Sequence, residues 1–74
     1  MIIYTSTKTE IKTLDITNVE ATNSTIYINN IVFDDVQLAQ GTIENPNLRV
    51  LELNLNDGDV VSAKDNELVT YTIV

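Results

Sequence analysis

The chain has 74 residues, 43% of them hydrophobic, and eleven acidic side chains against four basic ones give it a net charge of −7. This length allows one domain over residues 1–74 with a small core, and the absence of cysteine and histidine excludes a disulfide scaffold and argues strongly against a structural zinc site. The acidic balance argues against binding to nucleic acid or to an anionic membrane, because both attract clustered lysine and arginine.

β-branched side chains dominate the composition, with nine Ile, eight Val and ten Thr against three Ala, and this favours strands. Glycine occurs only twice, so we expect the nine Asn residues to form many of the turns. The opening segment MIIYTSTK has no basic region and no long apolar stretch, and no later run approaches the ~18 apolar residues that cross a membrane. We therefore expect neither a signal peptide nor a membrane-spanning segment.

The first predicted strand covers residues 2–9, and the second covers residues 11–19, where Leu14 and Ile16 share one face. A turn follows at residues 20–25.

Residues 25–33 predict a third strand with apolar side chains on both faces, which is typical of a strand that is central in a sandwich or covered by a partner. The alternative is a tight hairpin at Asn29 and Asn30, since asparagine tolerates a positive φ.

The segment at residues 34–40 is ambiguous. Asp34 and Gln37 have the spacing of a capping box and a glycine follows the segment, which favours one or two helical turns. Val36 and Leu38 instead alternate with polar residues as in a strand. The prediction is a short helical turn, with a strand as the alternative.

The second half begins with a loop around Pro46 and continues with the clearest alternation in the chain, at residues 49–55. There Leu51, Leu53 and Leu55 face inward. The remaining predicted elements are a turn at 56–59 with Gly58 at positive φ, a strand at 60–63, a turn at 64–67 and a strand at 68–74. Together these elements predict an all-β fold, a small antiparallel β-sandwich or barrel of about six or seven short strands.

Two acidic segments deserve a chemical interpretation. The segment NDGD superficially resembles a calcium loop, but such a loop lies between helices and ends in a glutamate, so Asp57 and Asp59 are interpreted as hairpin residues. Asp34 and Asp35 are adjacent carboxylates, but neighbouring side chains diverge in strands and helices alike, which favours capping or a turn over acid–base chemistry.

Nucleophilic catalysis finds little support in the sequence. No histidine or thiol is available, no glycine-rich loop exists, and a pair of Ser62 with Lys64 is the one conceivable arrangement. We therefore expect no enzyme activity, no cofactor and no metal site.

Aromatic residues and the last strand supply the candidates for a protein–protein interface. A core position is the stronger interpretation for Tyr27, whereas for Tyr4 core and interface remain equally open. The last strand is apolar up to the final residue, which we expect to be covered by the domain's own sheet or by another chain. The candidate interface residues are Tyr4, Tyr27, Phe33, Tyr71, Ile73 and Val74.

A small β-domain without staples, with apolar strands at both ends, predicts a non-enzymatic structural assembly protein that is a homo-oligomer or a subunit docked on another protein. Its Thr- and Asn-rich composition resembles that of bacteriophage virion components such as capsid decoration, head-fibre or tail accessory proteins, which implies a capsid or tail protein as partner and a location in the virion. Outside a phage we expect it in the cytoplasm. The alternative is a small acidic phage-encoded inhibitor that mimics DNA and binds a host nucleic-acid-processing enzyme.

Overall fold

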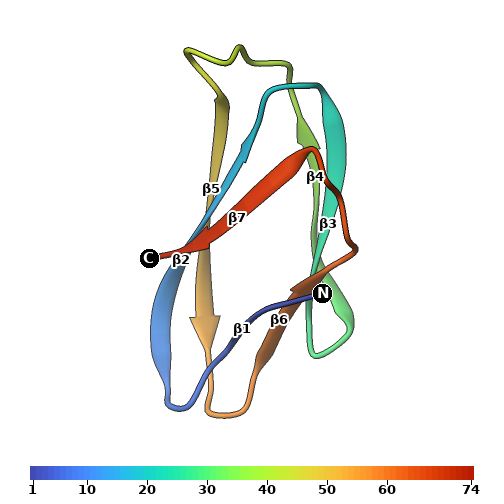
Figure 1. Ribbon diagram of the computed structural model, residues 1–74. Coiled ribbons are helices and arrows are strands. Elements are labelled where there is room, and N and C mark those ends of the chain that lie inside the picture. Colours follow the sequence, from blue (N-terminus) through green and yellow to red (C-terminus); the bar gives the residue numbers. More distant parts are fainter.

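The computed structural model describes residues 1–74 and contains seven strands and no helix (Figure 1). The prediction of an all-β domain with six or seven strands is confirmed. No helix of the length and hydropathy needed to span a bilayer is present. The strands are β1 (Ile2–Thr5), β2 (Glu10–Asn18), β3 (Thr22–Ile28), β4 (Ile31–Leu38), β5 (Asn47–Leu55), β6 (Val60–Ala63) and β7 (Val69–Ile73).

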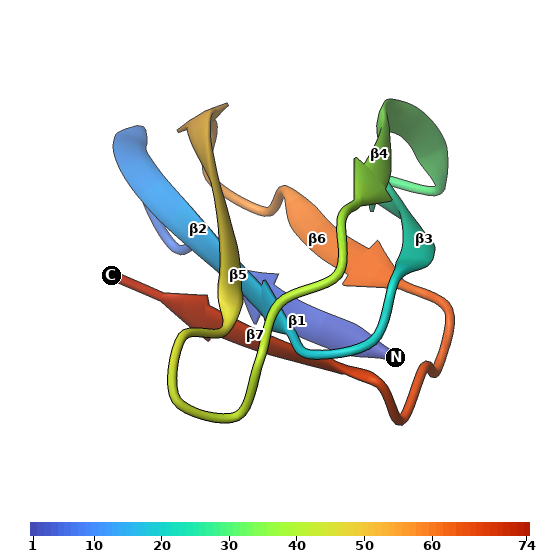
Figure 2. The ribbon, with the colours of Figure 1, turned by 90° about the horizontal axis from the view of Figure 1, so that it is seen from above.

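The strands form two antiparallel sheets packed face to face as a sandwich. One sheet has the order β1-β6-β3-β4 and the other has the order β5-β2-β7. Viewed from above, the sheets approach each other at β1 and β7, which are in contact, and diverge toward β4 and β5 (Figure 2). The sandwich is therefore closed along one side and open along the other.

The core lies between the sheets and consists of ten apolar side chains that are at most 9% exposed. Burial of a large aliphatic side chain contributes about 1.5–3 kcal/mol, so these residues supply most of the driving force for folding. The inward direction predicted for the three leucines of β5 is confirmed, and so is the common face predicted for Leu14 and Ile16 on β2. The core residues are Leu14, Ile16, Ile26, Val36, Leu38, Leu51, Leu53, Leu55, Val61 and Ala63.

A two-residue hairpin connects β3 and β4. Asn29 and Asn30 have φ angles of 53° and 63°, the left-handed values that a tight turn of this kind requires. The single strand predicted over residues 25–33 is therefore wrong, and the hairpin alternative is confirmed. The chain reverses because asparagine adopts positive φ at low cost, so Ile31 and Phe33 belong to a second strand, β4.

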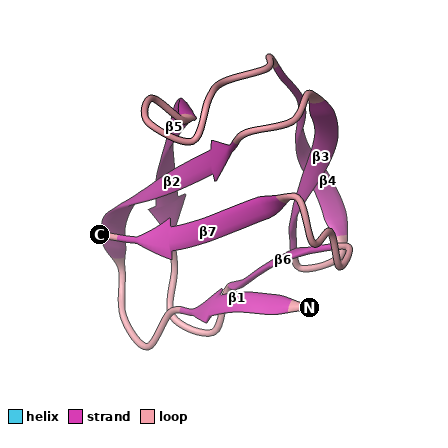
Figure 3. Cartoon of the chain, turned by 45° about the horizontal axis from the view of Figure 1, so that its top comes forward, coloured by secondary structure: helices cyan, strands magenta, loops and turns pink.

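The helical turn predicted at residues 34–40 is also wrong, because this segment continues strand β4 (Figure 3). Val36 and Leu38 lie in the core at 2% and 3% exposure, opposite Ser24 and Thr22 of β3. The hairpin delivers the chain alongside β3, and the ladder it forms there outweighs the local capping signal. The register shifts at Phe33, since Ile26 pairs with Asp34 whereas Tyr27 pairs with Val32.

The first strand is shorter than predicted and ends at Thr5. Beyond it, the backbone N–H of Ser6 donates to the oxygen of Asp59 at 2.9 Å, and the N–H of Gly58 donates to the oxygen of Ser6 at 2.8 Å. The turn before β6 thus provides hydrogen-bond partners for the backbone N–H and C=O groups of Ser6, just beyond the end of β1. This turn matches its prediction, with Gly58 at a φ of 89°.

Candidate interaction surface

The open side of the sandwich, defined by the free edges of β4 and β5, exposes two edge strands whose outer backbone groups are unpaired. Each is the outer strand of its sheet and has a hydrogen-bonded neighbour on one side only. On β2, Thr13 exchanges both backbone hydrogen bonds with Val74, at 2.9 and 3.4 Å. The backbone groups of every second residue of β2 therefore point to β7, and those of the residues between them point to β5. Through the register of β2 with β5, the residues that direct their backbone groups to the free edge are Leu48, Val50, Glu52 and Asn54.

Exposed apolar side chains gather along these two edges. Ile31, Val32 and Phe33, consecutive on β4, are 72%, 58% and 46% exposed, and Leu48 and Val50 on β5 are each 53% exposed. A run of three exposed apolar residues on an unpaired strand is unusual in a monomeric protein, because it invites pairing with another chain.

The open side also carries charges of both signs that have no ion-pair partner within the molecule. Asp34 lies opposite the buried Ile26, and Arg49 lies opposite the buried Ile16. The side chains of Asp34 and Arg49 therefore lie on the inner faces of the two edge strands. The two ion pairs of the structure lie elsewhere. The Nη1 atom of Arg49 reaches only the backbone oxygen of Gln37, at 3.4 Å.

Two of the residues predicted for an interface lie beside this edge. Tyr27 is half-buried on the outer face of its sheet, where it pairs with Val32 on one side and Ser62 on the other. Phe33 is the extra residue of the register shift next to it. The hairpin therefore brings Tyr27 and Phe33 together, as neighbours of the exposed run on β4.

The predicted residues of the last strand are placed differently. Tyr71 and Ile73 are half-buried and pack against the core. The hydroxyl of Tyr71 is 2.5 Å from the hydroxyl of Ser24 on the opposite sheet, which ties the two layers together. Val74 is 68% exposed and continues the pairing of β7 with β2. The structure does not bring these three residues to the open side.

Tyr4 takes part in a polar cluster at the closed side. Its hydroxyl donates to Oε2 of Glu10 at 2.6 Å, and the buried Ser6 donates to the same oxygen at 2.7 Å. The Nζ atom of Lys12 lies 3.8 Å from Oε1 of Glu10 and 5.6 Å from the centre of the tyrosine ring. The hydrogen bond from Tyr4 and then that from Ser6 lower the pKa of Glu10, and the same carboxylate raises the pKa of Tyr4.

The acidic residues of the NDGD turn are structural in this fold. Asp59 accepts hydrogen bonds from the backbone N–H of Asn56 at 2.8 Å and from the side chain of Asn29 at 2.9 Å. These bonds lower the pKa of Asp59 and join the turn before β6 to the β3–β4 hairpin. No group of three or more carboxylates lies close enough together to hold a metal ion.

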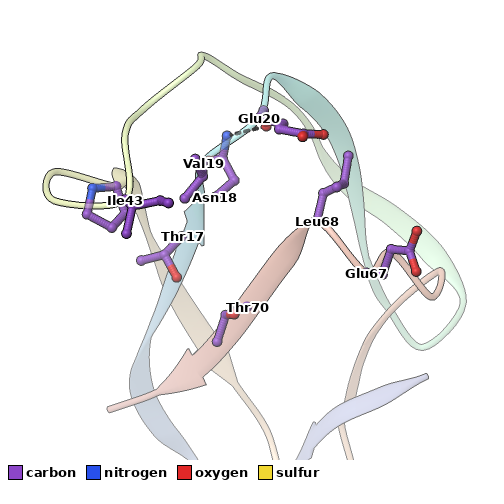
Figure 4. A pocket seen from close by; sticks show the side chains of 9 residues that line it. Thr17, Asn18, Val19, Glu20, Ile43, Glu67, Leu68 and Thr70 are labelled. Atoms are coloured by element: carbon purple, nitrogen blue, oxygen red, sulfur yellow. Dashed lines mark hydrogen bonds between the residues drawn. The ribbon is translucent and has the colours of Figure 1, made fainter.

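A hollow of about 410 Å³ lies at one end of the sandwich, between the ends of β2 and β7 and the segment that joins β4 to β5 (Figure 4). Glu20 and Glu67 flank it, and Ile43 and Leu68 provide apolar surface. Its lining contains no lysine, arginine, histidine or cysteine, so it offers neither a cation for an anionic ligand nor an imidazole or thiol group. The adjacent carboxylates Asp34 and Asp35 point to opposite faces of β4, so the two side chains do not converge on one site.

Comparisons with models of protein families, with curated protein sequences and with solved structures found no match. Function is therefore inferred from the surface of the chain itself. Of the features described above, the open side is the most unusual for a domain of this size, since it combines free backbone groups, exposed apolar side chains and unpaired charges.

Sequence reasoning missed most residues of this surface. Leu48 and Val50 occupy the outward phase of β5, where Glu52 and Asn54 are polar, and two apolar residues in that phase were the available signal. Ile31 and Val32 follow the Asn-Asn turn directly, but they were assigned to the interior of one long strand. Recognising the hairpin would have placed them at the start of a separate strand, directly after the turn.

Proposed function

We propose that this protein is a non-enzymatic structural subunit that acts through protein–protein contacts made by its open side. The observation that carries the proposal is the presence of two unpaired edge strands on the same side of the sandwich, both with exposed apolar side chains. β4 has 8 residues and β5 has 9 residues, so both are longer than the average strand of about 5–6 residues. Natural proteins shorten, charge or cover such edges unless pairing is their purpose.

The size of the molecule supports an assembled state. A standard protein–protein interface buries about 800 Å² on each partner, and the chain exposes 4789 Å² in all. One interface would thus cover about a sixth of the surface. For a domain whose core has ten residues, the apolar area buried in such a contact would be a substantial addition to stability.

The setting we propose is a bacteriophage particle, where the subunit would contact a capsid or tail protein or further copies of itself. The Thr- and Asn-rich all-β composition supports this setting. The alternative, an acidic inhibitor that mimics DNA, has less support, because the carboxylates are spread over both sheets. Asp15 and Glu52 lie on one sheet and Asp34 and Asp35 on the other.

The test of the proposed function is the mass of the protein in solution. Static light scattering during size-exclusion chromatography, from micromolar to near-millimolar protein, should give more than the monomer mass of 8.2 kDa. The double variant Val32→Thr with Val50→Thr keeps β-branched residues at the edge strands and removes apolar surface there, so it should shift the equilibrium toward the monomer.

Ile11→Thr is the matched control, because Ile11 is 66% exposed but lies on β2, away from the free edges. It should leave the mass unchanged. A wild-type chain that stays monomeric over the whole concentration range would overturn assembly from copies of this chain, and the open side would then need a different protein as its partner.

A further inference from the structure

The directions of the two edge strands favour a two-fold partner. β4 runs toward the end of the sandwich where residues 39–46 cross to β5, and β5 runs back from that end, so the two edges are antiparallel (Figure 1). The crossing segment passes over the end of the sandwich and leaves both edges uncovered (Figure 2). A two-fold axis parallel to the strands would therefore place β5 of a second molecule beside β4 of the first, in antiparallel orientation, and β4 of the second beside β5 of the first.

We propose that a second copy of this chain occupies the open side, with β4 of each molecule paired to β5 of the other. This inference rests on the proposed function and names the partner. The result is a dimer with two continuous antiparallel sheets, each made from the four-stranded sheet of one molecule and the three-stranded sheet of the other. The free edges of β4 and β5 in each molecule are both satisfied in one closed, isologous contact.

The faces of the strands agree with this arrangement. Rotation about an axis parallel to the strands brings the inner face of β5 into line with the inner face of β4 in the other molecule. Val36 and Leu38 then share a face with Leu51 and Leu53 of the second copy. Leu51 is the most exposed residue of the core, at 9%, and it lies on the edge strand that the second copy would cover.

The charges agree as well. The contact from Arg49 to the backbone of Gln37 puts these two residues at the same height along the strands. Because the two-fold axis preserves that height, Arg49 of one molecule lies level with Val36 and Gln37 of the other. Asp34 is two positions from Val36 on the same face, so it is the diagonal neighbour of Arg49. The dimer thus supplies both side chains with the ion-pair partner that each lacks in the single molecule.

Other self-pairings of the edges are less favourable. Antiparallel pairing of β4 with its own copy over the full strand brings Asp34 and Asp35 of both molecules together at the centre, where like charges repel. Pairing of β5 with its own copy leaves Arg49 and Glu52 on opposite faces, so they cannot form an ion pair across the contact. The cross-pairing of β4 with β5 is the one that matches opposite charges.

Charge exchange tests the contact. Arg49→Glu and Asp34→Lys, each alone, should raise the dissociation constant of the dimer about tenfold or more, and the two together should restore it. Lys64→Glu makes the same change of charge as Arg49→Glu in an exposed loop and should have no effect. Because Asp34 is half-buried, Asp34→Asn serves as a milder second variant, and circular dichroism checks that each variant is folded.

Cysteine pairing tests the register directly, since the chain has no cysteine of its own. Asp35→Cys on one batch and Val50→Cys on another lie on the same outer phase of the two edges. Mixed under mild oxidation, the two batches should form a cross-linked dimer faster than either batch alone, because a disulfide needs Cα atoms within about 4.4–6.8 Å.

The outcomes separate this inference from the proposed function. An assembly whose mass and dissociation constant are unchanged by both charge variants would overturn the cross-paired dimer and leave the proposed function in place. Charge-sensitive assembly into species larger than a dimer would replace the two-fold contact with an open chain of β4–β5 pairs. A wild-type monomer at every concentration would overturn the dimer and restrict the proposed function to contacts with a different protein.

Discussion

Buried polar side chains hold the two layers of this small sandwich in register. Ser6, Asn18 and Ser24 are at most 5% exposed, and each forms hydrogen bonds. Asn18 donates to the backbone oxygens of Glu20 and Ala39, at 2.9 and 2.8 Å, and so fastens β2 to the segment that leaves β4. Every buried side-chain nitrogen and oxygen has a hydrogen-bond partner. The hydrogen bonds of these groups therefore compensate for the cost of removing them from water.

Acid should weaken the fold through Glu10 and Asp59. Hydrogen bonds hold the pKa of each carboxylate below its ordinary value, 4.5 for Glu10 and 3.8 for Asp59. A lowered pKa in the folded state contributes stability above the pKa of the unfolded chain, and the contribution is lost as the pH falls through the folded pKa. We expect the free energy of unfolding, measured with urea, to fall below about pH 4.

Glu10→Gln and Asp59→Asn should each make this loss at low pH smaller, because the neutral side chain no longer responds to acid. Glu44→Gln changes an exposed carboxylate that accepts no hydrogen bond in the structure, and it is the matched control. If Glu10→Gln, Asp59→Asn and this control all showed the same pH profile as the wild type, the contribution of both hydrogen-bonded carboxylates would be excluded.

At the scale of the elements, β5 supplies three of the ten core residues, Leu51, Leu53 and Leu55. Leu53 is fully buried between the sheets. Leu53→Asp places an unpaired charge in the core, whose cost exceeds what a marginally stable domain can tolerate, so we expect an unfolded chain. Leu53→Ala should fold with a loss of about 2–5 kcal/mol in the free energy of unfolding.

Asn54→Asp is the control for that substitution, since it adds a carboxylate at the neighbouring exposed position. Circular dichroism and urea unfolding should show it folded and close to wild type. A folded Leu53→Asp variant would mean that β5 can leave the sandwich without loss of the remaining structure.

The elements that the sequence predicts best are those whose signal is local and periodic. Alternation alone identifies the inward leucines of β5, and Gly58 identifies the turn before β6. The segment after Asn30 was misjudged because its capping signals are local, whereas its strand state depends on pairing with β3.

The interaction surface was only partly predictable for a related reason. Tyr27 and Phe33 stand out by residue type. Ile31, Val32, Leu48 and Val50 become informative only once β4 and β5 are known to be edges on the same side. Strand order results from pairings between distant segments, and one sequence without a tertiary arrangement does not specify it.

At the scale of the whole molecule, self-association should appear as a stability that depends on protein concentration. If dimer formation is coupled to folding, mass action raises the melting temperature as the concentration rises. We expect calorimetric scans of the wild type at increasing concentration to shift upward, and scans of Arg49→Glu at the same concentrations to start lower, because its dimer dissociates more readily. A wild-type melting temperature that is independent of concentration would argue that the folded chain gains nothing from a second copy.

The strand order has a consequence for how fast the domain forms. β3 and β4 are the only strands adjacent both in the sequence and in a sheet, and the other four ladders join segments separated by at least one intervening strand. Such pairings cost the entropy of closing long loops before their hydrogen bonds form. We therefore expect folding on the millisecond-to-second scale of β-sandwiches, with the β3–β4 hairpin formed early. The exposed apolar residues of β4 are therefore in place in the hairpin before β5 has paired with β2. At that stage of folding, aggregation through these residues competes with formation of the complete sandwich.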